Sequence, residues 1–555
     1  MSLMSSLYIG VSGLQTSNNA LNTTAHNMSN LDTQGYTRQQ ALQGTRNYVT
    51  HTKTADKNWI QTGLGVNYTR TRQERDIILD RNYRREYGRS AFYDVSAAAL
   101  EEIEYILGES NEGHEFSEAL TGDNGLWVAV QELAKNPTLS VNQDLFMTKC
   151  YEFINKAKAV YDGLCTYQDN MNKKVKTDVD LVNKYAREIE ELNRKIMRVE
   201  GGPEHANDLR DRRNYLLDEL AKIGNISYSE DPSGYVSVRF EQVDLVKGSL
   251  VNEMCLYMDQ KTGFYTPYWK MLANFDKFDE KGEPIVSEEN IKSAKVFDLT
   301  QKISSQYDTD IGSLKATLLG RGDHRATYRE LDNINPDGRY EENWYNTHIS
   351  QSVVMNVQAE FDRLVNVITS KINSVLTEAA DRARLTNPGS DYLRDKNGDP
   401  YQVFLPMVEA DGTAETSWTV RNIIINSELR QNPSLLTFRL SEHSEDNETM
   451  EALKKAFEET IYTLNPNVET PLSFQDYYKN LVSQIANTGF VFRGIQENQT
   501  QATDALAYAR EEILGVSSDE ELTNMIMYQN AYNASSRYIN VISEMLDHLL
   551  STLGR

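Results

Sequence analysis

Both ends of the chain have almost no charged residues and no proline. Between residues 1 and 35 the only charged side chain is Asp32, and between residues 522 and 543 it is Arg537. All 12 prolines lie between residues 137 and 471. An exposed helix face usually carries Lys and Glu, and proline is the strongest helix breaker. The two ends are therefore predicted to be long helices whose polar faces are covered by other protein.

Cysteine is scarce, and long apolar runs are missing. The three cysteines, Cys150, Cys165 and Cys255, form no Cys-x-x-Cys pair, so we predict free thiols rather than a disulfide framework. No run of about 18 apolar residues could span a bilayer, and the N-terminus lacks the basic region of a cleaved signal peptide.

Basic residues are outnumbered. The chain has 555 residues, with 57 Lys and Arg against 81 Asp and Glu, which gives a net charge of −24. Binders of nucleic acid or of anionic membranes carry basic clusters, so we predict neither as a partner. The segment 70–89 is a local exception. It is read either as a solvated helix face with ion pairs or as a patch for an acidic partner.

The motifs of active sites and cofactor sites are missing as well. The eight histidines are too far apart for a helical zinc motif, and the Gly-Leu-Gly at 63–65 lacks the third glycine of a dinucleotide loop. Residues 395–399 resemble the start of a calcium loop, but Pro400 and Pro406 stand where glycine and glutamate belong. We predict no catalytic, cofactor or metal site, and we expect that the chain is not an enzyme.

What the ends do contain is a regular stripe of larger residues with alternating spacings of three and four. This spacing is typical of a two-helix coiled coil, and each stripe has one polar break, at Asn18 and at Ser535. We interpret the two stripes as an assembly seam. Its residues are Leu7, Val11, Leu14, Leu21 and Met28 in the N-terminal stripe, and Met525, Tyr528, Tyr532, Ile539, Ile542, Leu546 and Leu549 in the C-terminal stripe.

Between the ends, the apolar period changes from helix to strand and back. The predicted helices of this middle part cover residues 90–107, 126–134, 144–164, 175–199, 208–223, 353–377 and 474–513. Residues 40–70 are read as an extended linker with short strands, and 226–240 as a β-hairpin. A second β region lies near 400–440, with Ile423–Ile425 as its plainest strand.

These patterns predict an α+β multidomain protein. It would have coiled-coil helices at both termini, a long helical bundle and two inserted β-rich domains. The predicted parts are a terminal assembly domain (1–38 and 519–555), a helical bundle (39–225 with 345–390 and 470–518), a β-rich insertion (226–344) and a second β-rich insertion (391–469).

Short motifs at both ends resemble those of a known family. ALNTTAHNMSN at 20–30 precedes TQGYTRQ at 33–39, while SSDEEL at 517–522 precedes YQNAYNAS at 528–535. Together they resemble the motifs of the flagellar axial proteins, which include rod, hook and hook-associated proteins. The Thr-Arg-Gln ending and three internal stretches narrow the resemblance to hook-associated proteins of the hook–filament junction. These stretches are residues 207–213, 312–319 and 473–478.

The resemblance implies a structural component of the bacterial flagellum, outside the cell, that forms a ring between hook and filament. Paired terminal helices would form an inner tube, the bundle a second shell, and the β-rich insertions the outer surface. The implied partners are further copies of the chain, the hook protein, the second junction protein or filament, and a cytoplasmic export chaperone. Export would use the flagellar type III apparatus without a cleaved signal peptide.

Two alternatives stay open at this point. One is another axial protein, either the hook protein or the second junction protein, although the length and the long helical middle favour the first interpretation. The other is a secreted adhesin that would use the adhesive tripeptide Arg321-Gly322-Asp323. The family commonly has an Arg-Asp pair at this place, without the intervening glycine.

Overall fold

The computed structural model describes residues 3–53, 59–108, 116–202, 204–275, 284–407 and 418–553, and it leaves out the side chains of residues 49–62. Parts of the predicted domains lie outside the described residues, namely 1–2, 54–58, 109–115 (with His114), 203, 276–283, 408–417 and 554–555. Among the described helices, none is long and apolar enough to cross a membrane.

The chain divides into two compact units. The first contains Met1–Ser90, Leu181–Glu253 and Gln499–Arg555, and the second contains Ala91–Asp180 and Met254–Asn498. Helices α2 (Ile77–Leu107), α5 (Ser140–Glu200) and α12 (Phe474–Leu514) contribute residues to both. The four-part division predicted above follows other boundaries, and it stays a prediction.

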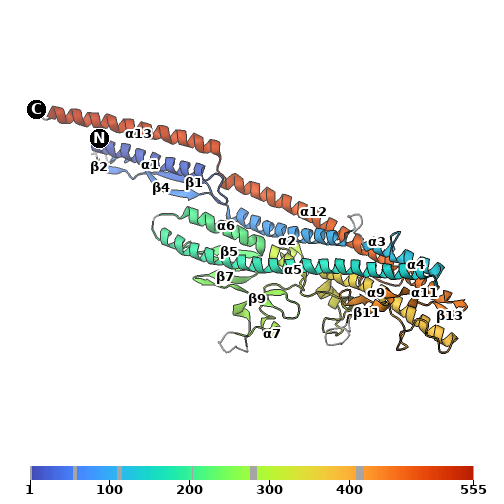
Figure 1. Cartoon of the computed structure of the whole chain (residues 1–555). Coiled ribbons are helices and arrows are strands. Elements are labelled where there is room, and N and C mark those ends of the chain that lie inside the picture. Colours follow the sequence, from blue (N-terminus) through green and yellow to red (C-terminus); the bar gives the residue numbers. More distant parts are fainter. Residues whose placement is uncertain are drawn as a thin grey trace. The chain divides into compact units, whose positions relative to one another are not determined.

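The first unit contains both terminal helices. Helices α1 (Leu3–Ser29) and α13 (Ser518–Leu553) lie side by side, and β1 and β4 pack along α1 (Figure 1). The strands after α1 form two antiparallel pairs, β1 (Gln39–Thr45) with β4 (Val66–Gln73) and β2 (Val49–Lys53) with β3 (Trp59–Thr62). The short strands predicted for 40–70 are confirmed, but β1 and β4 pair with each other and pack along α1, so the segment is not a linker.

The rest of the first unit is an αα-hairpin followed by a small sheet. The end of α5 turns into α6 (Asn207–Ile223). A four-stranded antiparallel sheet follows in the order β5-β6-β7-β8, formed by Ile226–Glu230, Val236–Phe240, Val243–Lys247 and Leu250–Val251. The hairpin predicted at 226–240 is β5–β6.

The second unit is mainly helical around one apolar core. Its central helix is α9 (Val353–Thr386), which packs against α8 (Ser313–Arg321) and α11 (Asn447–Glu458). The apolar stripe of α9, a helix predicted over 353–377, is buried and includes Phe361, Ile368 and Ile372. Phe116, at the start of α3 (Phe116–Thr121), has its ring centroid 4.9 Å from that of Phe361 and joins the same cluster. Helix α4 (Leu126–Lys135) also packs against α11.

The predicted break between helices at 144–164 and 175–199 was wrong. Helix α5 is a single helix of 61 residues. Its middle stretch is polar, which suggested a loop, but it contains neither proline nor glycine. Val175, Met171 and Gln168 are buried there, so tertiary packing holds the polar stretch in the helix.

The two inserted regions contain small antiparallel sheets with helices and turns among them. In the first, β9 (Met254–Met258) pairs with β10 (Tyr265–Trp269) and is followed by α7 (Glu288–Ile291) and α8. In the second, β11 (Phe404–Pro406) pairs with β12 (Ile423–Ile425), which is the predicted strand. The remaining elements there are α10 (Ser427–Gln431), β13 (Arg439–Ser441), β14 (Ser444–Glu445) and α11. Short 3₁₀ or π turns occur at Lys270–Leu272, Ser305–Tyr307, Tyr328–Asp332, Tyr345–Ile349 and Pro433–Leu435.

A buried carboxyl in the core of the second unit makes its stability depend on pH. Glu360 Oε1 accepts hydrogen bonds from Asn465 Nδ2 at 2.7 Å and from Asn356 Nδ2 at 3.3 Å. Burial raises the pKa of Glu360 to about 7, whereas in an unfolded chain it is about 4.3. The folded state therefore holds a proton that the unfolded state has lost, and stability falls as pH rises between these two values.

We expect Glu360→Gln to remove this pH dependence, because the amide keeps the acceptor and carries no charge. Between pH 5 and pH 8 the unfolding free energy of the wild type should fall by on the order of 2 kcal/mol, while that of the variant should not show this fall. Urea denaturation of the full chain at several pH values measures this. Glu378→Gln, at an exposed site on the same helix, is the control. Parallel pH curves for wild type and Glu360→Gln would contradict the expectation.

Candidate assembly site

The two terminal helices run antiparallel at close range. A Cβ atom added to Gly10 would lie 2.7 Å from Ile539 Cγ1, and one added to Gly13 would lie 2.7 Å from Ser535 Oγ. Asn27 Nδ2 donates to Glu521 Oε2 at 3.1 Å. Going forward along α1 from Gly13 to Asn27 therefore corresponds to going backward along α13 from Ser535 to Glu521. A β-carbon at either glycine would therefore require the facing side chain, Ile539 or Ser535, to move.

The face of α1 that meets α13 consists of small residues. Small residues recur there at spacings of three and four, in a stripe that contains the buried Gly10 and Asn27 and the half-buried Gly13. Besides these three, the stripe contains Ser6, Ser17, Ala20 and Thr24. Two glycines within a helix cost about 1 kcal/mol each relative to alanine, so α1 depends on its partner for stability.

The C-terminal stripe provides the larger side chains of this contact. Ile539 and Ser535 lie against the glycines, and Ile542 is buried one turn further on. The other residues expected in that stripe, Met525, Tyr528, Tyr532 and Leu546, are half-buried, while Leu549 is exposed.

The N-terminal stripe expected from the sequence lies beside this contact rather than in it. Leu7, Leu14, Leu21 and Met28 are half-buried, and Val11 is exposed. Small residues allow the helix backbones to approach closely, and the bulky neighbouring stripe then cannot share the same interface. From the sequence, the uncharged face with Gly10, Gly13 and Ala20 was expected to pack closely against other protein, but the contact with the C-terminal helix was assigned to the apolar stripe. The alternation of Ser, Gly, Ala and Thr with the same spacing was visible.

A third face of α1 contacts the strands. Ser12 is buried; its hydroxyl donates to Ile9 O at 2.7 Å and accepts a hydrogen bond from Val66 N at 3.2 Å. Because Val66 begins β4, this contact fixes the strand pair against the helix.

At the end of α1, Asn27 connects three segments. Its Nδ2 donates to Gln39 O at 2.8 Å and to Glu521, and its Oδ1 accepts from Tyr36 OH at 2.8 Å and from Gln39 N at 3.0 Å. All four hydrogen-bonding sites of the amide are therefore used in a buried position. Burial, together with the charge of Asp208, raises the pKa of Tyr36, so its hydroxyl stays protonated as a donor.

Arg38 fixes the beginning of α13. Its Nε is 2.8 Å from Glu521 Oε1, and one terminal nitrogen is 2.7 Å from Glu520 Oε2. Its backbone N donates at 2.9 Å to the carbonyl of Leu514, the last residue of α12. The acidic first turn of α13 is also favoured by the helix dipole. We call Asn27, Tyr36, Arg38, Gln39 and Glu521 the Asn27 cluster.

The Asn27 cluster is continued by Asp211 on α6. The carboxylate accepts from Thr37 N at 3.1 Å and from Gln73 Nε2 at 2.8 Å, and it lies 3.6 Å from Arg75. Burial raises the pKa of Asp211 to about 6. The loop after α1 is thus attached to the αα-hairpin as well as to α13.

A separate ion-pair network joins α2, α6 and the end of α12. Arg510 reaches Asp80 and Asp218, both at 2.7 Å, and Arg84 reaches Asp218 at 2.6 Å. Arg84 and Arg510 are nearly buried, and each also lies over a tyrosine ring. Removal of one partner would leave a buried charge uncompensated.

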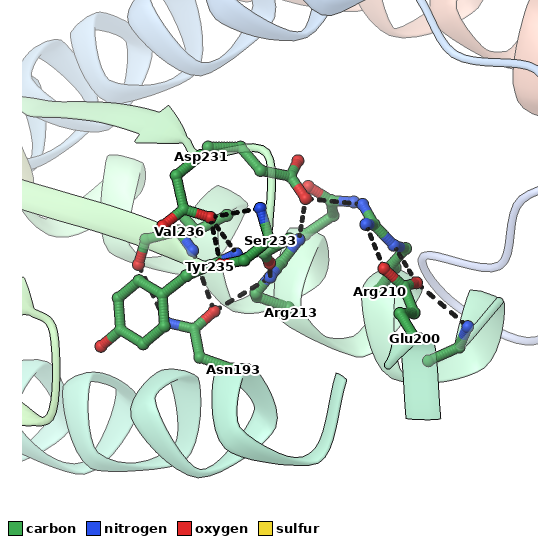
Figure 2. A network of polar contacts seen from close by, with 12 residues as sticks. Asn193, Glu200, Arg210, Arg213, Asp231, Ser233, Tyr235 and Val236 are labelled. Atoms are coloured by element: carbon green, nitrogen blue, oxygen red, sulfur yellow. Dashed lines mark hydrogen bonds and ion pairs between the residues drawn. The ribbon is translucent and has the colours of Figure 1, made fainter. Parts of the chain in front are cut away.

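The αα-hairpin is tied to β5–β6 by the polar network in Figure 2. Glu200 accepts two hydrogen bonds of 2.7 Å from Arg210, which lowers the pKa of Glu200. Arg213 is buried and donates to Asn193 Oδ1 at 2.9 Å and to Gly234 O at 2.6 Å. Asp231 closes the hairpin turn by accepting from the backbone of Ser233 and Tyr235, both at 2.9 Å. The charged residues of the segment 207–213 thus have structural partners.

The tripeptide Arg321-Gly322-Asp323 cannot serve as an adhesive motif in this structure. Arg321 is 1% exposed, and it donates to Asn172 Oδ1 at 2.6 Å and to Tyr265 O at 3.0 Å. Burial lowers the pKa of Arg321 to about 10. Since an adhesive arginine must reach a receptor, the adhesin alternative is wrong.

The described residues hold no cluster of metal ligands. No group of three His, Cys, Asp or Glu side chains there could hold a metal ion. Residues 395–399 form a turn in which Asp395 accepts from the backbone of Asn397 and Asp399, both at 2.9 Å. Cys150, Cys165 and Cys255 are free thiols, and burial raises the pKa of Cys165 to about 11.

Three segments of the chain match models of known protein families. Residues 7–37 match the flagella basal body rod protein family, and residues 510–552 match the C-terminal family of the flagellar basal body rod proteins FlgEFG. Residues 100–391, about half of the chain, match the helical domain of the flagellar hook-associated protein FlgK. The chain belongs to the FlgK family of flagellar hook-associated proteins. The resemblance inferred from the sequence motifs is therefore confirmed.

Full-length relatives support the FlgK assignment. Flagellar hook-associated protein 1 of Bacillus subtilis is 27% identical over 99% of both chains. The proteins of the same name from Salmonella typhimurium and Escherichia coli are 23% and 22% identical over 98% of both chains. A solved structure, the flagellar hook junction protein FlgK from Burkholderia pseudomallei, covers 79% of this chain and 100% of its own, with a TM-score of 0.51 at 10% identity, and so supports the fold.

Membership of the FlgK family settles the class of function. The chain is a structural component of the bacterial flagellum, and it is not an enzyme. The match to the FlgK helical domain also distinguishes it from rod and hook proteins, which the terminal motifs alone do not.

We expect Asn27→Ala to loosen the Asn27 cluster, because Gln39 N and Tyr36 OH lose their buried acceptor. The local cost should be about 2–3 kcal/mol, which corresponds to a decrease of roughly 30- to 140-fold in amide protection. Hydrogen exchange of peptides covering 24–39 and 518–525 measures it. Asn22→Ala, exposed on the same helix, should leave protection unchanged. Equal exchange in both variants would show that the cluster does not hold these segments.

Proposed function

We propose that this chain assembles with copies of itself into a ring between hook and filament, through its paired terminal helices. The observation that carries the proposal is that each terminal helix uses only part of its surface within the chain. Several large apolar side chains of α1 and α13 are exposed beside the contact. They are Met4, Tyr8 and Val11 on α1, and Leu522, Ile526, Met527, Tyr538, Val541, Met545, Leu549 and Leu550 on α13.

Exposed apolar area of this kind has a physical cost that assembly removes. Full burial of one Val, Leu, Ile or Met side chain contributes about 1.5–3 kcal/mol. The proposed assembly seam is the N-terminal stripe of Leu7, Val11, Leu14, Leu21 and Met28, meeting the exposed apolar side of α13 of a neighbouring copy. The small-residue face of α1 would serve the contact within each chain, and the bulky stripe would serve the contact between chains.

The partners follow from this position in the flagellum. They are the hook protein on one side, the second junction protein and filament on the other, and a cytoplasmic chaperone before export. The solved relative is described as a hook junction protein, which supports this placement. The protein would leave the cell through the flagellar type III apparatus, and the terminal helices would pair fully only after export.

Deletion of the gene in the source bacterium tests the junction role directly. We expect hooks to be present by electron microscopy, with filament protein shed into the medium and motility lost. A complementing copy should restore attached filaments. Normal filaments in the deletion strain, or loss of the hooks themselves, would contradict a role at this junction.

The assembly seam is tested by Val11→Asp. Val11 is 38% exposed, so the charge should leave the chain folded, yet it would have to be desolvated at a contact between copies. We expect secretion of a folded variant that attaches no filaments and gives non-motile cells. Gln301→Asp, exposed in the other unit, is the control and should swim normally. Wild-type motility of Val11→Asp would remove this stripe from the assembly.

A further inference from the structure

The basic segment 70–89 forms part of a cavity whose charge is opposite to that of the chain. The cavity lies in the first unit, among the end of β4, the start of α2, α6 and β5, and has a volume of about 520 Å³. We call it the arginine cavity. Its charged wall residues are Arg70, Arg72, Arg75, Arg81 and Arg210 against Asp80 and Glu230.

The two carboxylates of the wall are already neutralised within the chain. Asp80 lies 3.0 Å from Arg75 and 2.7 Å from Arg510. Glu230 lies 2.7 Å from Arg210 and 3.1 Å from Arg213. The arginines that bind them are therefore used, and neither carboxylate can balance further positive charge in the cavity.

The remaining arginines are available to a ligand. Within the described part of the chain, Arg70 and Arg81 make no ion pair, and both are exposed. Arg81 Cζ lies 5.7 Å from the ring centroid of Tyr228, which also lines the cavity. Arg72 pairs with Glu74 at 2.9 Å at a solvent-exposed site, where such a pair contributes about 1 kcal/mol or less and is readily exchanged.

We propose that the arginine cavity binds exposed carboxylate side chains of a second copy of the chain. This proposal rests on the assembly of copies proposed above and names a contact outside the terminal helices. Each copy has a net charge of −24, so packing copies into a ring brings like charges together. A positive cavity in the unit that carries α1 and α13 offsets this repulsion. Guanidinium groups also match carboxylates with paired hydrogen bonds, which fixes orientation.

Photo-crosslinking in assembled flagella tests the contact. A photoreactive amino acid replaces Ile77, which lines the cavity and is 61% exposed, so all the arginines stay in place. We expect a crosslink to a second copy, with an Asp- or Glu-containing peptide identified by mass spectrometry. The same amino acid at Val11 reports whether copies touch through the terminal helices. If copies are crosslinked from Val11 but not from Ile77, the cavity contact is overturned and the proposed assembly of copies into a ring stands. If copies are crosslinked from neither position, both the cavity contact and the proposed ring are overturned.

Charge reversal shows whether the arginines cause the contact. In Arg70→Glu/Arg81→Glu, the crosslink from Ile77 between copies should fall at least tenfold, while Arg70→Lys/Arg81→Lys should retain most of it. Arg187→Glu, an exposed arginine of the same unit outside the cavity, is the matched control. Circular dichroism of each secreted chain checks folding. An unchanged crosslink after reversal, or a crosslink from Ile77 to a different protein, overturns the proposal.

Discussion

The close approach of α1 and α13 is the constraint on which the rest of the first unit depends. With no side chain at Gly10 and Gly13, the backbone of α1 comes near enough for Ile539 and Ser535 to fill the space above them. A helix with such a face gains little stability from its own sequence. It requires a partner at short range, and the register of that partner decides which residues of both helices are left for other contacts.

The polar residues around the end of α1 hold this register. Asn27 and Arg38 both bind the start of α13 through Glu521, while Asp211 attaches the intervening loop to α6. A buried amide with all its hydrogen bonds made tolerates no shift along the helix, because each displaced group would be left unsatisfied. The motifs shared with flagellar axial proteins thus correspond to particular hydrogen bonds. They are not simply a record of common descent.

The chain as a whole is acidic, whereas its first unit contains a cavity lined by arginines. The acidic excess favours solubility, but it opposes close packing of copies. Within the first unit, the buried or half-buried Arg84, Arg210 and Arg510 are paired with carboxylates of α6, α5 and α2. The exposed Arg70 and Arg81 on the wall of the arginine cavity make no ion pair within the described residues. The network around Arg510 and Arg84 is thereby structural, whereas the unpaired guanidinium groups are free to act between molecules.

The sequence by itself determined that both ends are helical, since neither contains proline and both carry a regular stripe at spacings of three and four. It also determined the stripe of α13, the hairpin at 226–240, the strand at 423–425 and the family. Only the tertiary structure decided which stripe of α1 faces α13, because helical periodicity identifies faces but not their partners. The tertiary structure also decided that α5 is continuous through a polar stretch and that Arg321 is buried. Each depends on neighbours distant in sequence, which supply the burial and the hydrogen bonds that local propensity cannot.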